Sequence, residues 1–128
     1  MTRRLDALVT LAWGALAALH LAPAAVLVMP GLVERLYGVS AQGEAGVLLI
    51  HRGALFLALV VLCVGCIVGH GARRAASLAV ATSMLGFLAV YAAAGLPAGG
   101  LRTIFVADLL GLVPLALVVW AAWRPVRP

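Results

Sequence analysis

The sequence is poor in charged residues and contains only two cysteines. Of its 128 residues, 10% are charged and 66% are hydrophobic, and the mean hydropathy is +1.19. A soluble domain of this size leaves too much surface in water to hide so many apolar residues. The composition therefore excludes a soluble enzyme, a disordered segment and a secreted disulfide scaffold, and it predicts a single membrane domain over residues 1–128.

Lysine is absent, so all nine cationic side chains are arginines. In a soluble protein the formal net charge of +5 would suggest nucleic-acid binding. Here most arginines stand between apolar runs, which is typical of membrane topology, and we expect no nucleic-acid partner. Six lie on one predicted side and two on the other: Arg3, Arg4, Arg73, Arg74, Arg124 and Arg127 against Arg35 and Arg102. This bias predicts a multi-pass protein of the cell's inner (cytoplasmic) membrane with both termini in the cytoplasm.

Four apolar stretches are long enough to cross a bilayer, which takes about 20 helical residues. We expect helices at about 7–29, 44–69, 75–95 and 103–123. The stretches are continuously apolar and rich in leucine and alanine, which excludes the alternating strands of a barrel. Short connections containing proline and glycine predict antiparallel neighbours. The expected fold is all-α, an antiparallel bundle of four transmembrane helices.

The segment 30–43 is the only sizeable stretch outside these helices. We expect it to lie in the outer interface as a short helical turn, either as a connector anchored by Tyr37 or as a lid. The start of the chain also resembles a cleavable signal peptide, with an Ala22-Pro23-Ala24 sequence after the apolar run. That run is longer than a signal core, so we interpret it as the first transmembrane helix.

Ionisable residues inside the apolar stretches point to a site. Counted from the outer surface at the helical rise, His51 and Arg52 lie about 11 Å deep in the second helix. Asp108 lies about 8 Å deep in the fourth helix, and His20 roughly 13 Å deep in the first. Four ionisable side chains from three helices therefore reach one level of the outer half of the bundle. A polar pocket lined by all four is expected there.

An isolated charge at that depth is costly, by roughly 2.5 to 3.5 kcal/mol on insertion scales. We therefore expect Arg52 and Asp108 to contact each other, because guanidinium and carboxylate match as a planar fork. Two interpretations stay open. The pair can be a latch that sets the register of two helices, or it can belong to a functional site, as intramembrane ionisable residues commonly do.

A functional site of this kind suits acid–base chemistry of an isomerase, cyclase or hydrolase type. His51 is the expected proton carrier, Arg52 stabilises a developing oxyanion, and Asp108 orients a histidine, with His20 as the fourth member. The substrate is expected to be a lipophilic small molecule or a membrane lipid. Glu44, Tyr91 and Arg102 lie near the mouth of the pocket and are further candidate substrate-binding residues, together with Arg35 and Tyr37 of the segment 30–43.

Two other functions remain open, a proton-coupled small transporter and a non-catalytic partner subunit. Because four short helices enclose little volume, we expect a homo-oligomer. We expect no metal or cofactor, since no histidine lies four residues from another to form a local chelate.

The Cys63-Val64-Gly65-Cys66 sequence is similar to the dithiol of four-helix quinone-linked disulfide generators. Those proteins use a second cysteine pair that this chain lacks, so we interpret Cys63 and Cys66 as small packing residues.

Several polar marks recur in order among the apolar residues: ERLYGV at 34–39, HRGALF at 51–56, SMLGF at 83–87 and RTIFVAD at 102–108. This succession resembles a family of small bacterial four-helix integral membrane proteins. Some members carry a phosphopantetheine adenylyltransferase label, but this chain has no nucleotide-binding or phosphate motif to support it. The resemblance implies that Arg35, Tyr37, His51, Arg52 and Asp108 are marks of the family pattern, and it supplies no substrate.

Overall fold

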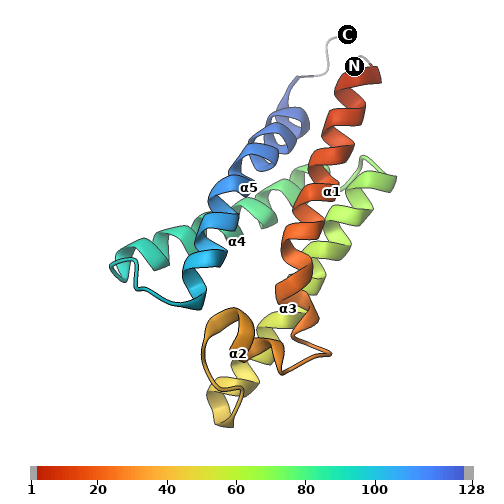
Figure 1. Ribbon diagram of the computed structural model, residues 1–128. Helices are drawn as coiled ribbons and strands as arrows, with labels where there is room; N and C mark the ends of the chain where they lie inside the picture. Colours follow the sequence, from red (N-terminus) through yellow and green to blue (C-terminus); the bar gives the residue numbers. More distant parts are fainter. Residues whose placement is uncertain (1–2, 126–128) are drawn as a thin grey trace.

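The computed structural model describes residues 3–125, which form helices and no strand. There are five helices in this part of the chain (Figure 1): α1 Arg3–Ala25, α2 Leu32–Tyr37, α3 Gly43–Val68, α4 Arg73–Ala93 and α5 Gly100–Trp123. The four longer helices are each long and apolar enough to cross a membrane. The all-α prediction with four long apolar helices is thereby confirmed, and α2 occupies the expected short turn between the first two.

The first helix ends earlier than expected, at Ala25 instead of Met29. Pro23 lies in its last turn and has no backbone N–H to donate. Beyond Ala25 the chain tightens into turns, in which the N–H of Leu27 donates to the carbonyl of Ala24 at 3.1 Å. This tightening turns the chain toward α2.

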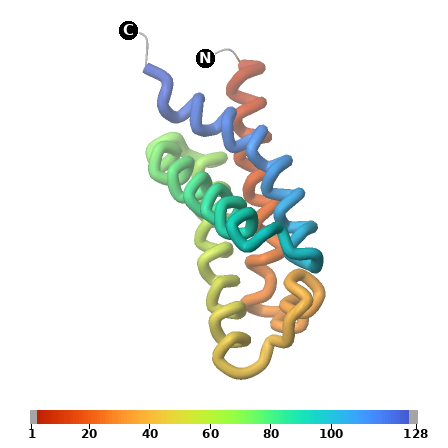
Figure 2. The backbone as a smooth tube through the Cα atoms, turned by 90° about the vertical axis from the view of Figure 1, so that its left-hand side faces the viewer, coloured from red at the N-terminus to blue at the C-terminus, as the bar shows by residue number. Residues whose placement is uncertain are grey.

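The helices run up and down with neighbours in sequence lying antiparallel. The start of α1 and the end of α5 lie at one end of the molecule, and α2 lies at the other (Figures 1 and 2). The most extensive packing joins α1 to α3, while α5 packs against both α1 and α4. The short α2 packs against α5 and α3, so it closes the end of the bundle at which these helices begin.

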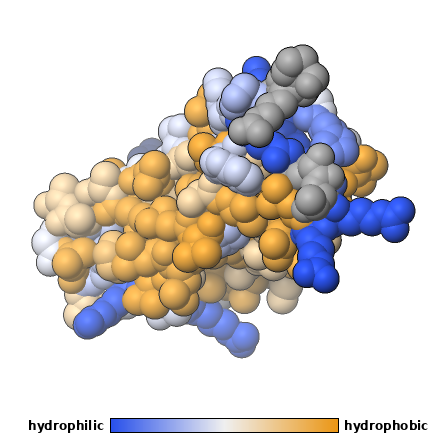
Figure 3. Space-filling model, turned by 90° about the horizontal axis from the view of Figure 1, so that it is seen from above, coloured by the Kyte–Doolittle hydropathy of each residue, from blue (hydrophilic) through white to orange (hydrophobic). Residues whose placement is uncertain are grey.

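The core lies along the inner faces of the four long helices. One cluster of buried side chains draws on all four: Trp13 and Leu16 of α1, Cys63 and Cys66 of α3, Val80 and Met84 of α4, and Leu115 and Val118 of α5. A second cluster beneath α2 contains Val26, Val33 and Tyr37. The outward faces are apolar as well, and Figure 3 shows hydrophobic surface with hydrophilic side chains protruding from it. Such a surface is expected of helices that face lipid.

Two glycines permit close backbone approaches at the α2 end. A methyl group placed on Gly53 of α3 would lie 2.8 Å from the backbone nitrogen of Leu27. One placed on Gly100, at the start of α5, would lie 2.8 Å from the carbonyl oxygen of Leu36. The missing side chains therefore let α3 approach the end of α1, and let α5 approach α2. These approaches draw together the elements that surround a cavity.

Candidate functional site

A cavity with a volume of about 180 Å³ lies between the five helices, toward the α2 end. Its wall is mainly apolar, and the apolar lining includes Leu19, Pro23, Leu36, Phe56, Phe87, Ile104 and Ala107. Six polar side chains complete it: His20, Tyr37, Arg52, Ser83, Thr103 and Asp108. An apolar pocket with a few convergent polar groups is the usual form of a small-molecule site.

The cavity brings together four of the residues singled out from the sequence. His20 comes from α1, Tyr37 from α2, Arg52 from α3 and Asp108 from α5. His20 is 2% exposed, Tyr37 and Asp108 are each 7% exposed, and Arg52 is partly buried. Residues that are between 15 and 88 positions apart in sequence thus line one cavity.

Arg52 is surrounded by aromatic rings. Its guanidinium carbon lies 5.0 Å from the centre of the Phe56 ring, 5.7 Å from that of Tyr37 and 5.8 Å from that of Phe87. Each distance lies within the range of a cation–π interaction, in which a ring face attracts a positive charge. Three helices therefore contribute to one aromatic cage around the guanidinium.

The predicted direct contact between Arg52 and Asp108 is not formed. No ion pair joins them in the part of the chain that the structure describes, although they line the same cavity and interact electrostatically over a longer distance. The aromatic cage supplies the physical reason, because it stabilises the guanidinium without a carboxylate in contact. Both charged groups are thereby left facing the cavity.

His20 is held in one tautomer by its backbone. Its Nδ1 lies 2.8 Å from the carbonyl oxygen of Leu16, one helical turn earlier. A carbonyl only accepts hydrogen bonds, so Nδ1 carries the proton, and in the neutral ring Nε2 is the acceptor. No residue in the described chain bonds to Nε2, and the ring lines the cavity. His20 therefore offers a proton acceptor to a bound molecule.

Tyr37 offers the opposite capacity. Burial raises the pKa of its hydroxyl above the ordinary value of 10.0, and the positive charge of Arg52 opposes this in part. The hydroxyl therefore keeps its proton at neutral pH. It has no hydrogen-bond partner among residues 3–125, so it can donate to a molecule in the cavity.

His51, the expected proton carrier, does not line the cavity. Its side chain is exposed on the outside of α3. Neighbouring residues on an α-helix point in directions about 100° apart. Arg52 lines the cavity, and this step turns the side chain of His51 out of its wall. The prediction that all four ionisable residues line the pocket is therefore corrected, and His20 is the histidine that lies inside.

The other predicted binding residues lie outside the cavity. Arg35, Glu44 and Arg102 are exposed and do not belong to its lining. Tyr91 is buried, but its hydroxyl donates to the carbonyl of Pro97. Its ring packs beside those of Phe87 and Phe105. Tyr91 therefore holds the turn between α4 and α5.

Sequence reasoning missed the aromatic cage and two hydroxyl groups, those of Ser83 and Thr103. A signal was present, since Arg52 and Phe56 are four residues apart, as are Ser83 and Phe87. Residues at this spacing share one helix face. A search for aromatic residues one turn from the buried arginine would have found Phe56.

The two cysteines lie outside the cavity. Cys63 and Cys66 are free and each is 0% exposed, within the main core. We expect neither thiol to react with N-ethylmaleimide in the folded protein and both to react after denaturation, as measured by intact mass. Ser40→Cys, in the exposed loop before α3, provides a matched reactive control. Labelling of Cys63 or Cys66 at the rate of that control would contradict their placement.

A comparison of the chain with protein-family models, curated proteins and solved structures finds no match. The family resemblance stays a prediction. The functional proposal below therefore rests on the cavity and its side chains.

Proposed function

We propose that this protein crosses the bacterial cytoplasmic membrane four times, with both termini in the cytoplasm, and binds a lipophilic small molecule in the cavity. The observation that carries the proposal is the state of Arg52. The Arg52 side chain is partly buried beside an apolar wall, and none of its N–H groups has an acceptor in the described chain. Guanidinium donors that face an apolar pocket without a partner favour a bound molecule that carries an acceptor.

A ligand oxygen would supply that acceptor. A carbonyl or carboxylate in the cavity accepts hydrogen bonds from Arg52 and from the Tyr37 hydroxyl, while its hydrocarbon part contacts Phe56 and Phe87. The volume limits the size of the bound part. An apolar cavity of about 150 Å³ accommodates benzene, and this cavity, at about 180 Å³, is similar in size. We infer that it holds a head of about one ring, with any longer chain extending between the helices.

The groups around the cavity suit acid–base chemistry on such a head. Nε2 of His20 accepts a proton from a carbon next to the carbonyl, and the charge that develops on the oxygen is stabilised by Arg52. Tyr37 donates to the same oxygen, and Asp108 supplies a carboxylate. A proton-transfer reaction of an isomerase or cyclase type fits these roles, with His20 in the place expected for His51.

The test is to fill the cavity. Ala107 of α5 lines it, and Ala116 of the same helix is exposed. We expect the wild-type protein and Ala116→Phe to copurify with a lipophilic compound in near-stoichiometric amount when extracted from native membranes in mild detergent. Ala107→Phe should lose at least nine tenths of it, because the new ring occupies the cavity. Mass spectrometry of solvent extracts measures the amount.

Equal retention by Ala107→Phe and Ala116→Phe would contradict the assignment, provided that both variants keep wild-type helicity. A wild-type protein with no compound above the detergent background would contradict it too. Proton-driven uptake into liposomes by the wild type would instead favour the transporter.

A further inference from the structure

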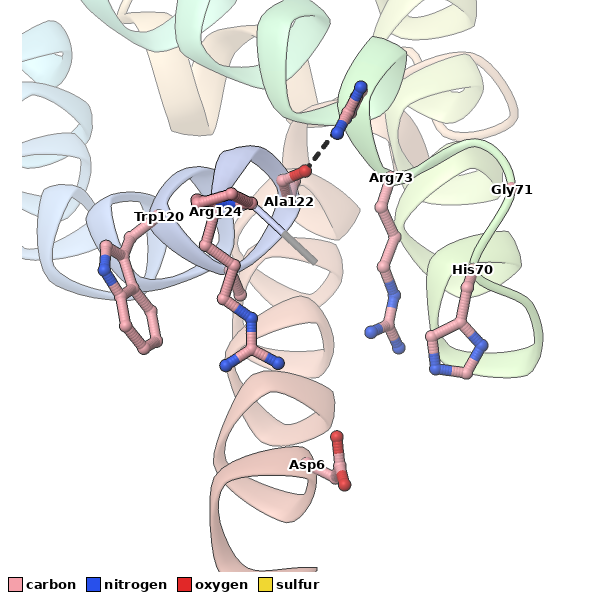
Figure 4. A pocket seen from close by; sticks show the side chains of 10 residues that line it. Asp6, His70, Gly71, Arg73, Trp120, Ala122 and Arg124 are labelled. Carbon is pink, nitrogen blue, oxygen red and sulfur yellow. Dashed lines mark hydrogen bonds between the residues drawn. The ribbon is translucent and has the colours of Figure 1, made fainter. Parts of the chain in front are cut away.

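A second, polar groove lies at the opposite end of the molecule from α2. It has a volume of about 1000 Å³ and lies between the first turn of α1, the turn before α4 and the end of α5. Its charged lining consists of Arg73, Arg74, Arg124 and a single carboxylate, Asp6. The groove therefore carries positive charge. Figure 4 shows Arg73, Arg124 and His70 projecting into it from different elements, with Asp6 facing them.

Two of the arginines are held in place by helix ends. Nε and Nη2 of Arg73 donate to the carbonyl oxygen of Cys66 at 3.0 and 2.9 Å, and Nε of Arg74 donates to that of Ala122 at 3.0 Å. These carbonyls belong to the last turns of α3 and α5, where helices leave carbonyl groups unpaired. Since a guanidinium has five N–H donors, each arginine keeps further donors that no residue of the described chain accepts. The helix ends therefore orient the guanidinium groups of Arg73 and Arg74 and leave some of their N–H donors available to a ligand.

Tryptophans flank the same groove. The guanidinium carbon of Arg124 lies 5.5 Å from the ring centre of Trp120, and that of Arg74 lies 5.4 Å from that of Trp123. Both rings are about half exposed, at 52% and 49%. Tryptophan rings concentrate at the headgroup level of a bilayer, where one edge is apolar and the other is wet. The groove therefore lies where phospholipid phosphates would lie if the helices cross the membrane.

We propose that this groove binds the phosphate of an anionic phospholipid. Guanidinium groups match phosphate oxygens in geometry and charge, and basic pockets between helices on the cytoplasmic side bind acidic headgroups. The start of α4 at Arg73 adds the positive end of a helix dipole. The flanking tryptophans favour a lipid over a soluble phosphate compound. The assignment rests on the proposed membrane insertion but not on the cavity near α2.

The test titrates delipidated protein in detergent with dioleoylphosphatidylglycerol or dioleoylphosphatidylcholine and counts bound lipid by native mass spectrometry. The wild type should bind phosphatidylglycerol at least tenfold more tightly. The double variant Arg73→Gln/Arg74→Gln should lose that preference. Arg35→Gln/Arg102→Gln, which removes the same charge from two exposed positions remote from the groove, should keep it. Ala107→Phe should keep it as well, so that the two proposals fail separately.

A second measurement uses no arginine variant and therefore does not depend on their folding. Phosphatidylglycerol brominated near its headgroup should quench the fluorescence of the wild type more than brominated phosphatidylcholine. Trp120→Phe should reduce that excess, because only Trp123 then remains beside the groove. Equal quenching by the two lipids would overturn the proposal. An equal loss of binding in the two double variants would overturn it as well. So would a wild type that binds inorganic phosphate in the groove at millimolar concentration but shows no preference between the two lipids.

Discussion

Replacing Arg52 with glutamine should lower retention of the cavity ligand at least tenfold. A hydrogen bond to a charged group is worth about 1.5–3 kcal/mol, and about 1.4 kcal/mol corresponds to a factor of ten. Glutamine removes the charge and most donors but leaves a polar side chain of similar reach within the rings of Tyr37, Phe56 and Phe87. The measurement is the amount of copurified compound per protein, followed by titration of the identified compound.

His51→Gln is the matched control. This histidine precedes Arg52 in the same helix and is exposed, so its replacement should change retention less than twofold. Arg52→Lys separates charge from geometry, because a lysine keeps the cation but loses the planar fork. An Arg52→Gln protein that folds and retains ligand like the wild type would show that the arginine is a packing element. The latch interpretation would then be favoured.

Replacing Gly53 with alanine should lower the free energy of unfolding by about 1–3 kcal/mol, the usual cost of overpacking a tight contact. The added methyl group would lie 2.8 Å from the backbone nitrogen of Leu27. A backbone atom cannot move aside as a flexible side chain can, so α3 must shift away from the end of α1. Because that shift changes the cavity wall, ligand retention should fall as well. Thermal unfolding in detergent, followed by circular dichroism, measures the change.

Gly65→Ala provides the control on the same helix. A methyl group at Gly65 meets no atom within 4 Å, so only the backbone effect of the substitution is left. Alanine in a helix is favoured over glycine by roughly 0.5–1 kcal/mol, and we expect Gly65→Ala to be as stable as the wild type or slightly more so. Equal unfolding temperatures for the two variants would contradict the close approach at Gly53.

The long helices could be predicted because length and apolarity are properties of single segments. A run of some twenty apolar residues is helical in any arrangement of its neighbours, since its backbone must be satisfied internally. The ends were less predictable. Helix α5 starts at Gly100, before the expected Thr103. This start could not be predicted from the segment alone, because Gly100 packs against Leu36 and that contact depends on where α2 lies.

The members of the site were predictable in part, for a geometric reason. Depth along a helix is determined by counting residues at about 1.5 Å each, and this count placed His20, Arg52 and Asp108 at one level. Direction around the helix axis is not determined in this way. Rotating the helix by about 100°, the angle between neighbouring residues, would bring His51 to the cavity in place of Arg52. Only packing against other helices selects between these two orientations.

The sequence by itself determined the all-helical architecture, the number of long apolar segments and the level at which ionisable groups lie, because these depend on residues counted along one chain segment. The tertiary structure alone decided that His20 faces the cavity and His51 does not. It also decided that aromatic rings, and not the carboxylate of Asp108, contact the guanidinium of Arg52. Those outcomes depend on how the helices rotate and approach one another, and close packing between separate segments determines that rotation.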